Sequence, residues 1–249
     1  MMERGAQRFT PMAGFFAFIW RMALTTGTGS IFGFLVARQA FDSALLAPLF
    51  IALSLSYGLA VFLLVLMLAF QGSGRALDTA LLARFARLQV IFVAAGLYFV
   101  LVYHLTNLYF TKHHDFERFI LLEGGVHTAL FWLGQVLLGG IVPMALLLHP
   151  RIGELRGRIT AATLLVVGGG FAQMWVTIVS GQAFPLVMFP GRQVSSSFHD
   201  GVVNAYTPTL PEWLLGFCGV AIAGLIVMLA LKFLAFLPAH LDGAETARG

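Results

Sequence analysis

Long apolar runs separated by short polar segments restrict this chain to a small number of folds. Each of six runs is longer than the roughly 20 residues that an α-helix needs to cross a bilayer. They cover residues 11–36, 44–70, 89–110, 119–148, 159–184 and 212–238. Because a bilayer core offers no hydrogen bonds, a spanning segment must pair its backbone groups internally, as a helix does. We therefore predict an all-α, polytopic transmembrane bundle of about six spans, forming a single membrane domain.

The composition agrees with a membrane protein and excludes several partners. Hydrophobic residues make up 59% of the chain and charged residues 10%, whereas soluble domains carry about 25% charged residues. The net charge is +4, but the basic residues lie in short segments beside the spans, which indicates contact with membrane lipids and not with nucleic acid. Cys218 is the single cysteine, so no cysteine cluster is available for zinc, an iron–sulfur centre or covalent haem.

The basic residues also predict the orientation of the chain. With a cytoplasmic N-terminus, the inner segments hold ten lysines and arginines and the outer segments hold four. The inner ones are Arg4, Arg8, Arg75, Arg84, Arg87, Arg151, Arg156, Arg158, Lys232 and Arg248, and the outer ones are Arg38, Lys112, Arg118 and Arg192. Basic residues are enriched in cytoplasmic loops, so both termini are expected in the cytoplasm.

Several segments depart from plain apolar spans. Arg21 and the glycine- and hydroxyl-rich residues 25–30 make the first run an imperfect span that we expect to pack against protein. Residues 71–88 are polar and basic with an amphipathic pattern, which predicts an interfacial helix. The glycines of residues 168–170 predict close packing between helices.

The third and fourth runs form a helical hairpin that carries polar residues at matched depths. Counted from a polar tip centred on Asp115, His104 lies 11 residues before and His127 lies 12 residues after. Asn107 and Glu123 each lie eight residues from the same centre. Equal counts mean equal depth in an antiparallel pair, so these side chains are expected to form two levels in the outer half of the membrane.

Ionisable groups inside a membrane are costly and usually have a function. We predict that His104, Glu123 and His127 form a proton relay, with Asn107 orienting Glu123 through a hydrogen bond. Interhelical hydrogen bonds that only hold the bundle together are the structural alternative. A further alternative to the relay is that His104 and His127 bind haem as its axial ligands.

Two blocks of short motifs stand out, one in and beside the long outer loop of residues 185–211 and one near the start of the chain. The motifs of the first block are Gly-Gln-Ala-Phe-Pro-Leu (181–186), Phe-Pro-Gly (189–191), Val-Ser-Ser-Ser-Phe (194–198) and Tyr-Thr-Pro-Thr-Leu-Pro-Glu (206–212). Those of the second are Gly-Ser-Ile-Phe-Gly-Phe (29–34), Ala-Arg (37–38) and Ala-Pro-Leu-Phe-Ile (47–51). These motifs resemble the NrfD/PsrC family of quinone-interacting membrane anchors, and the long-loop form is similar to its DsrP-like branch. The resemblance covers roughly residues 25–238, and the first helical bundle of the family plan has no counterpart in it.

The resemblance implies a subunit that exchanges electrons between membrane quinone or quinol, menaquinone or ubiquinone, and a periplasmic iron–sulfur protein. It implies further subunits of a redox complex, a place in the bacterial cytoplasmic (inner) membrane, and no metal or haem bound by this chain. Arg38 and Asn107 are then expected near the quinone. The outer loop, rich in apolar residues, is expected to cover the bundle and help dock the iron–sulfur partner.

Two other functions are compatible with the residues. A membrane transporter, or a subunit of a proton-conducting channel, could use the glycine-interrupted helices, with Gln135 and Gln173 lining a site near the middle of the membrane. A transporter is expected to contain an internal repeat, and none is visible in the sequence. The third function is a structural anchor that docks partners without contacting quinone.

Overall fold

The computed structural model describes residues 2–74, 77–149, 154–186 and 201–233. Every regular element in these ranges is helical. The long elements are α1 (Met2–Gly33), α2 (Leu46–Gly72), α3 (Thr79–Tyr109), α7 (Leu155–Met174) and α9 (Leu210–Phe233). The shorter ones are η1 (Thr111–His113), α4 (His114–Arg118), η2 (Phe119–Glu123), α5 (Val126–Ala129), η3 (Leu130–Ile141), α6 (Val142–Leu148), η4 (Trp175–Ser180) and α8 (Gly181–Ala183). The predicted all-α architecture is confirmed.

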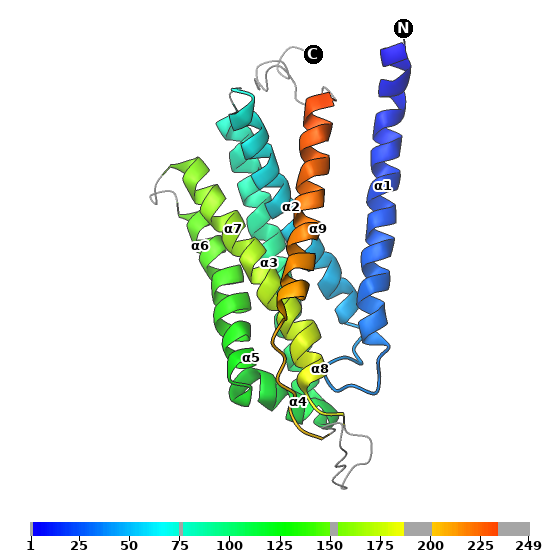
Figure 1. The fold of residues 1–249 in the computed structure, drawn as a ribbon, viewed down its shortest axis with the longest axis vertical. Helices are drawn as coiled ribbons and strands as arrows, with labels where there is room; N and C mark the ends of the chain where they lie inside the picture. The colour runs from blue at the N-terminus through cyan, green and yellow to red at the C-terminus, as the bar shows by residue number, and fades with distance from the viewer. Residues whose placement is uncertain (1, 75–76, 150–153, 187–200, 234–249) are drawn as a thin grey trace.

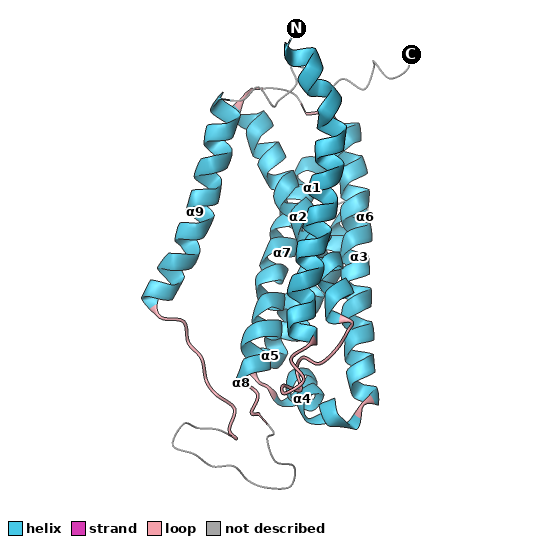
Figure 2. Cartoon of the chain, turned by 90° about the vertical axis from the view of Figure 1, so that its right-hand side faces the viewer, coloured by secondary structure: helices cyan, strands magenta, loops and turns pink. Residues whose placement is uncertain are grey.

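Four helical rods form the bundle: α2, α3, the continuous α5–η3–α6 rod, and α7 with η4 and α8 (Figure 1). Helix α1 packs along α2 at its edge. Helix α9 stands apart from the bundle, and none of its residues is buried (Figure 2). The first described turns of α1 and the last of α9 lie at the same end of the molecule, as an even number of crossings requires (Figure 1).

Five of these rods are long and apolar enough to cross a membrane among the described residues. They are residues 46–72, 79–109, 126–148, 155–183 and 210–233. The sequence predicted a sixth span over residues 11–36, and residues 11–33 of this segment belong to α1, a helix of 32 residues. Arg21 and the hydroxyl-rich residues 25–30 lower its hydropathy, which is why composition alone does not identify α1 as a span.

The predicted interfacial helix over residues 71–88 is wrong. Helix α2 continues to Gly72, and Thr79 begins α3, which runs without a break to Tyr109. The side chain of Asp78 accepts a hydrogen bond from the backbone N–H of Ala80 at 2.9 Å and so caps the start of α3. No glycine or proline separates the amphipathic turns from the apolar ones, so the two segments form one helix.

The hairpin tip is longer than the sequence predicted. Residues 111–123 form a short helical layer, here called the α4 layer, that lies across the end of the bundle (Figure 2). The next rod begins only at Val126, after Gly124 and Gly125. Gly125 has φ +57°, a left-handed conformation that glycine adopts without strain. The predicted span over residues 119–148 therefore starts about seven residues too early, since residues 119–125 belong to the layer and to its glycine break.

The glycine-rich stretch of α7 packs as predicted. A Cβ built on Gly169 would lie 2.2 Å from Cα of Gly139, because the backbones of α7 and η3 touch there. Small residues allow such close contact between membrane helices, so the prediction of close packing is confirmed at Gly169.

Most of the predicted outer loop, residues 187–200, lies outside the described residues, and its docking role stays a prediction. The part that is described is anchored to the bundle at two points. The backbone N–H of Asn204 donates to the carbonyl of Ala183 at 3.0 Å. The ring of Tyr206 lies 5.8 Å from that of Trp175.

Candidate functional site

The α4 layer turns one amphipathic face toward the bundle. Four of its buried residues, His113, Phe116, Glu117 and Ile120, follow the spacing i, i+3, i+4 and i+7, which is one face of a helix, and Phe119 is buried beside them. The side chains of Glu117 and Ile120 are each 0% exposed. A carboxylate therefore sits in the middle of an otherwise largely apolar contact surface, where it must have partners.

Glu117 is bound at both of its carboxylate oxygens. Nδ1 of His104 lies 2.7 Å from Oε2, and Nδ2 of Asn107 donates to Oε1 at 2.8 Å. His104 and Asn107 lie three residues apart on α3, so both face the α4 layer. The ring of His104 also packs edge-on against Phe131, with 4.7 Å between ring centroids. These contacts fix a carboxylate, an imidazole and an amide in one buried cluster.

The structure does not bring the predicted relay together as the sequence suggested. The predicted hydrogen bond from Asn107 to Glu123 is wrong, because Asn107 donates to Glu117 instead. Glu123 is exposed at the end of η2 and forms an ion pair with Arg118, with 2.6 Å between Oε1 and Nη2. His127 lies one turn beyond the glycine break, and its Nδ1 is 2.6 Å from Oγ of Ser180. The prediction counted residues as if both helices continued to the tip, but residues 111–123 lie across the end of the bundle. Glu117 therefore occupies the place beside Asn107 that was predicted for Glu123.

The α1–α2 connection, residues 34–45, closes the bundle beside the α4 layer. His113 donates from Nδ1 to the carbonyl of Gln39 at 2.6 Å, and the hydroxyl of Tyr103 donates to the carbonyl of Ala40. Lys112 forms an ion pair with Asp42 at 2.7 Å. This connection and the α4 layer together form what is called here the bundle mouth, at the end that the charge distribution predicts to be outer.

Arg38 belongs to the same mouth. Its Nη1 donates to the carbonyl of Gln182 at 2.8 Å and to that of Phe184 at 3.3 Å, which holds the end of the α7 rod against the α1–α2 connection. The ring of Phe184 in turn packs at a tilt of 48° against that of Phe119 in the α4 layer, with 5.4 Å between ring centroids. Arg38 therefore positions an aromatic wall of the mouth.

An open cleft of about 590 Å³ lies against this wall. Phe119 and Phe184 form its apolar side, and Arg118 and Glu123 form its charged side. Small-molecule sites have volumes of roughly 300–1,000 Å³ and combine apolar walls with a few polar groups. We call this space the mouth cleft.

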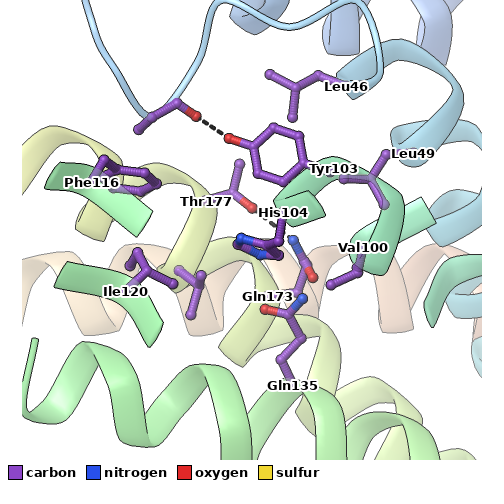
Figure 3. A pocket seen from close by; sticks show the side chains of 12 residues that line it. Leu46, Leu49, Val100, Tyr103, His104, Phe116, Ile120, Gln135, Gln173 and Thr177 are labelled. Atoms are coloured by element: carbon purple, nitrogen blue, oxygen red, sulfur yellow. Dashed lines mark hydrogen bonds between the residues drawn. The ribbon is translucent and has the colours of Figure 1, made fainter. Parts of the chain in front are cut away.

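The cavity next to His104 is much smaller, with a volume of about 20 Å³. In Figure 3 the side chains of His104, Gln135, Gln173 and Thr177 lie around it. Such a volume accepts a water molecule but not a six-membered ring. A ring-sized ligand therefore fits the mouth cleft and not the cavity that His104 lines.

Glu117 is the residue that the sequence reasoning missed. It lies within the charged tip, where a solvated side chain is the ordinary expectation. Two signals could have identified it: the Gly124-Gly125 pair, which marks the true start of the next rod, and the buried stripe through Phe116 and Ile120, which places Glu117 on an apolar face.

Comparison with known proteins gives this arrangement a context. Residues 2–186 match the family described as "Polysulphide reductase, NrfD". The chain belongs to the NrfD family. It shares 32% identity over 236 residues with a protein of Archaeoglobus fulgidus named "Hdr-like menaquinol oxidoreductase integral membrane subunit". That alignment covers 94% of this chain and 58% of the relative.

Two further relatives are named as parts of reductases. A putative membrane subunit of dimethyl sulfoxide reductase from Halobacterium salinarum is 30% identical over 92% of this chain and 54% of its own length. A selenate reductase subunit from Mesobacillus selenatarsenatis is 26% identical over 82% of this chain and 45% of its own. The chain thus spans about half the length of these relatives. No solved structure matches it significantly.

NrfD-family membership and the helices together identify a multi-pass integral membrane protein. In the described ranges, no three histidine, cysteine, aspartate or glutamate side chains are grouped so that they could hold a metal ion. The titratable groups that the structure brings together beside the mouth are the carboxylate of Glu117 and the imidazole of His104, 2.7 Å apart.

Proposed function

We propose that this chain is the quinone-reactive membrane subunit of a redox complex. It exchanges electrons between membrane menaquinone or ubiquinone and a periplasmic iron–sulfur protein, within a complex of several subunits. The observation that carries the proposal is the buried Glu117, bound by His104 and Asn107 directly beneath the bundle mouth. The relative named as a menaquinol oxidoreductase subunit supports the choice of substrate class.

The mouth cleft is the proposed binding place for the quinone ring. Phe119 and Phe184 would contact the two faces or the edge of the ring, and Glu123 lies at the polar side of the same cleft. Arg38 donates to the carbonyl of Phe184 and would thereby hold one wall of the proposed quinone site in place. Asn107 acts one step further in, by orienting Glu117.

Oxidation of a quinol to the quinone releases two electrons and two protons, and the reverse reaction consumes them. The electrons pass to or from the iron–sulfur cluster of the partner. The protons pass through Glu117 and His104, whose hydrogen bond allows a proton to move between carboxylate and imidazole. Glu123, which is exposed at the mouth, exchanges protons with outer water. His127, whose ring nitrogen lies beside the hydroxyl of Ser180, is a second group that could take up a released proton.

The proposed orientation of the chain in the membrane has the mouth on the periplasmic side of the bacterial cytoplasmic membrane. A reporter fused after Gly249 is expected to be active in the cytoplasm, and one inserted next to Arg192 in the periplasm. The ten inner against four outer basic residues motivate this expectation. The reverse pattern from both fusions would overturn the orientation and place the mouth in the cytoplasm.

The function is tested on the intact complex in membrane vesicles. Reduced menaquinol or ubiquinol is added without oxygen, and reduction of the partner's iron–sulfur cluster is followed by electron paramagnetic resonance. We expect reduction with the parent chain, and slower reduction with Glu123→Gln, which keeps its size but cannot titrate. Because water can replace an exposed carboxylate, this decrease is expected to be only a few-fold, at the low end of acid–base effects. No electron exchange with either quinol, in either direction, would show that the proposed function is wrong.

A further inference from the structure

Two small cavities follow one another along the inside of the bundle. The first is lined by His104 and Thr177, the second by Ser56, and both are lined by Gln135 and Gln173. Each has a volume of about 20 Å³. A buried water molecule needs at least about 10–15 Å³ and two to four polar partners. Each cavity therefore has room for one water, and the polar side chains around it are of the right kind.

The two glutamines carry carbonyl oxygens that the described residues leave without a hydrogen bond. Oε1 of Gln135 and Oε1 of Gln173 are both buried and have no partner within the described ranges. Nε2 of Gln173 donates to the hydroxyl of Thr177 at 2.8 Å, whereas Oε1 has no such partner. In Figure 3 both glutamine side chains reach the cavity beside His104. An unsatisfied buried acceptor costs about 1–3 kcal/mol, which a water in the cavity would remove.

The polar side chains continue inward from the second cavity. Gln89 is fully buried on α3, and its Nε2 donates to the carbonyl of Ser56 at 3.1 Å and to its hydroxyl at 3.2 Å. Oε1 of Gln89 is a third buried acceptor without a partner in the described part of the chain. His104 and Gln89 are 15 residues apart on α3, which corresponds to roughly 22 Å along a helix. Polar groups therefore extend from the bundle mouth past the middle of α3.

The inner end of this polar line is closed by apolar residues. Leu63, Leu82 and Ile159 are each 0% exposed and Phe70 is 2% exposed, and all four belong to one hydrophobic cluster. A proton cannot pass such a cluster without a polar group or water. The line of polar groups is consequently open toward His104 and closed toward the opposite end of the bundle.

We propose that each cavity binds one water molecule, and that the two waters, held by Gln135 and Gln173, join His104 to Ser56 and Gln89 in one line of hydrogen bonds. Amides, hydroxyls and water do not hold an extra proton near neutral pH, so this line orients the imidazole of His104 for proton exchange with Glu117 and does not itself carry protons. This role at His104 rests on the proposed quinone-linked function. The binding of the two waters does not depend on that function.

Radiolytic labelling of the intact complex tests the waters directly. Brief X-ray exposure converts bound waters to hydroxyl radicals that oxidise neighbouring side chains, and mass spectrometry locates the products. We expect labelling at Val100, which lines both cavities, and at Val176, which lines the first. Leu82, which is also buried but lies in the apolar cluster, is the internal reference and should stay unlabelled. Labelling of Val100 and Val176 no higher than that of Leu82 would overturn the proposal without any variant.

A double variant, Gln135→Leu with Gln173→Leu, identifies the side chains that hold the waters. Leucine is similar in size to glutamine but cannot bind water, so labelling at Val100 should be lost. Gln71→Leu is the matched control, because Gln71 is exposed at the inner end of α2 and should leave the labelling unchanged. Persistent labelling in the double variant would mean that other groups hold the waters, and the assignment to Gln135 and Gln173 would be wrong.

Turnover then separates waters that orient His104 from waters that only stabilise the fold. In the double variant, with Glu117 intact, we expect quinone-linked turnover to fall roughly tenfold, less than the loss of a direct acid–base group, which is about 10²-fold or more. Labelling that is lost while turnover stays at the parent rate would show that the waters are structural. If the parent complex itself shows no quinone-linked turnover, the proposed function fails, while the labelling result still decides whether the waters are bound.

Discussion

Glu117→Gln is expected to lower quinone-linked turnover by about 10²-fold or more while the complex assembles normally. Glutamine keeps the size of the side chain and can still accept the hydrogen bond from Asn107, but it cannot take up or release a proton. A positioned acid–base group contributes roughly 10²–10⁴-fold to a reaction, so the loss at a fully buried site should be large. The measurement is the rate of quinol-driven reduction of the iron–sulfur partner in membrane vesicles, with protein amount determined by quantitative blotting.

The control for this variant is Glu154→Gln. Glu154 is an exposed carboxylate at the opposite end of the bundle, where it precedes α7 without a side-chain capping bond. Its replacement removes the same charge and should leave turnover at the parent rate. If Glu117→Gln also turns over at the parent rate, the buried cluster only holds α3 against the α4 layer, and the proton path must use other groups.

The difference between Glu117 and Glu123 shows what the hairpin count could and could not predict. His104 and Asn107 are recognisable as polar groups on a membrane helix, because both lie in an apolar run that hydropathy defines well. Their partner was assigned by assuming that the two helices continue up to the tip. The α4 layer adds residues that lie across the bundle and not along it, and this rearrangement depends on the glycine break at residues 124–125.

The boundaries of the spans illustrate the same limit. Helix length follows from hydropathy when a run is bounded by glycine or charge, and α2 and α9 begin within two residues of the predicted positions. The start of α3 is instead fixed by one side chain, Asp78, which hydrogen-bonds the first turn. An amphipathic pattern at the start of a longer helix is read as a separate interfacial helix unless this cap is noticed.

Gly169→Ala is expected to destabilise the chain, and Gly168→Ala is expected not to. A Cβ on Gly169 would lie 2.2 Å from Cα of Gly139, so α7 and η3 must move apart to accept one methyl group. Overpacking of this kind costs about 1–3 kcal/mol, and more where the contact is with backbone. At Gly168, nothing lies within 4 Å of a new Cβ, and alanine favours the helix by up to about 1 kcal/mol over glycine. Thermal unfolding of the purified chain in detergent should give a lower Tm for the first variant and an equal or higher Tm for the second.

The same pair of variants tests whether helix contact and site geometry are coupled. Gly139 and Gly169 themselves line the second small cavity. Each also lies four residues, about one helical turn, from a glutamine that lines both cavities, Gln135 or Gln173. Moving α7 away from η3 would enlarge the cavities and weaken the hold of the glutamines on their contents. We therefore expect Gly169→Ala to lower turnover as well as Tm, even at temperatures where it remains folded. If Tm falls but turnover of the folded protein is unchanged, the contact serves stability alone, and the glutamines keep their geometry independently of it.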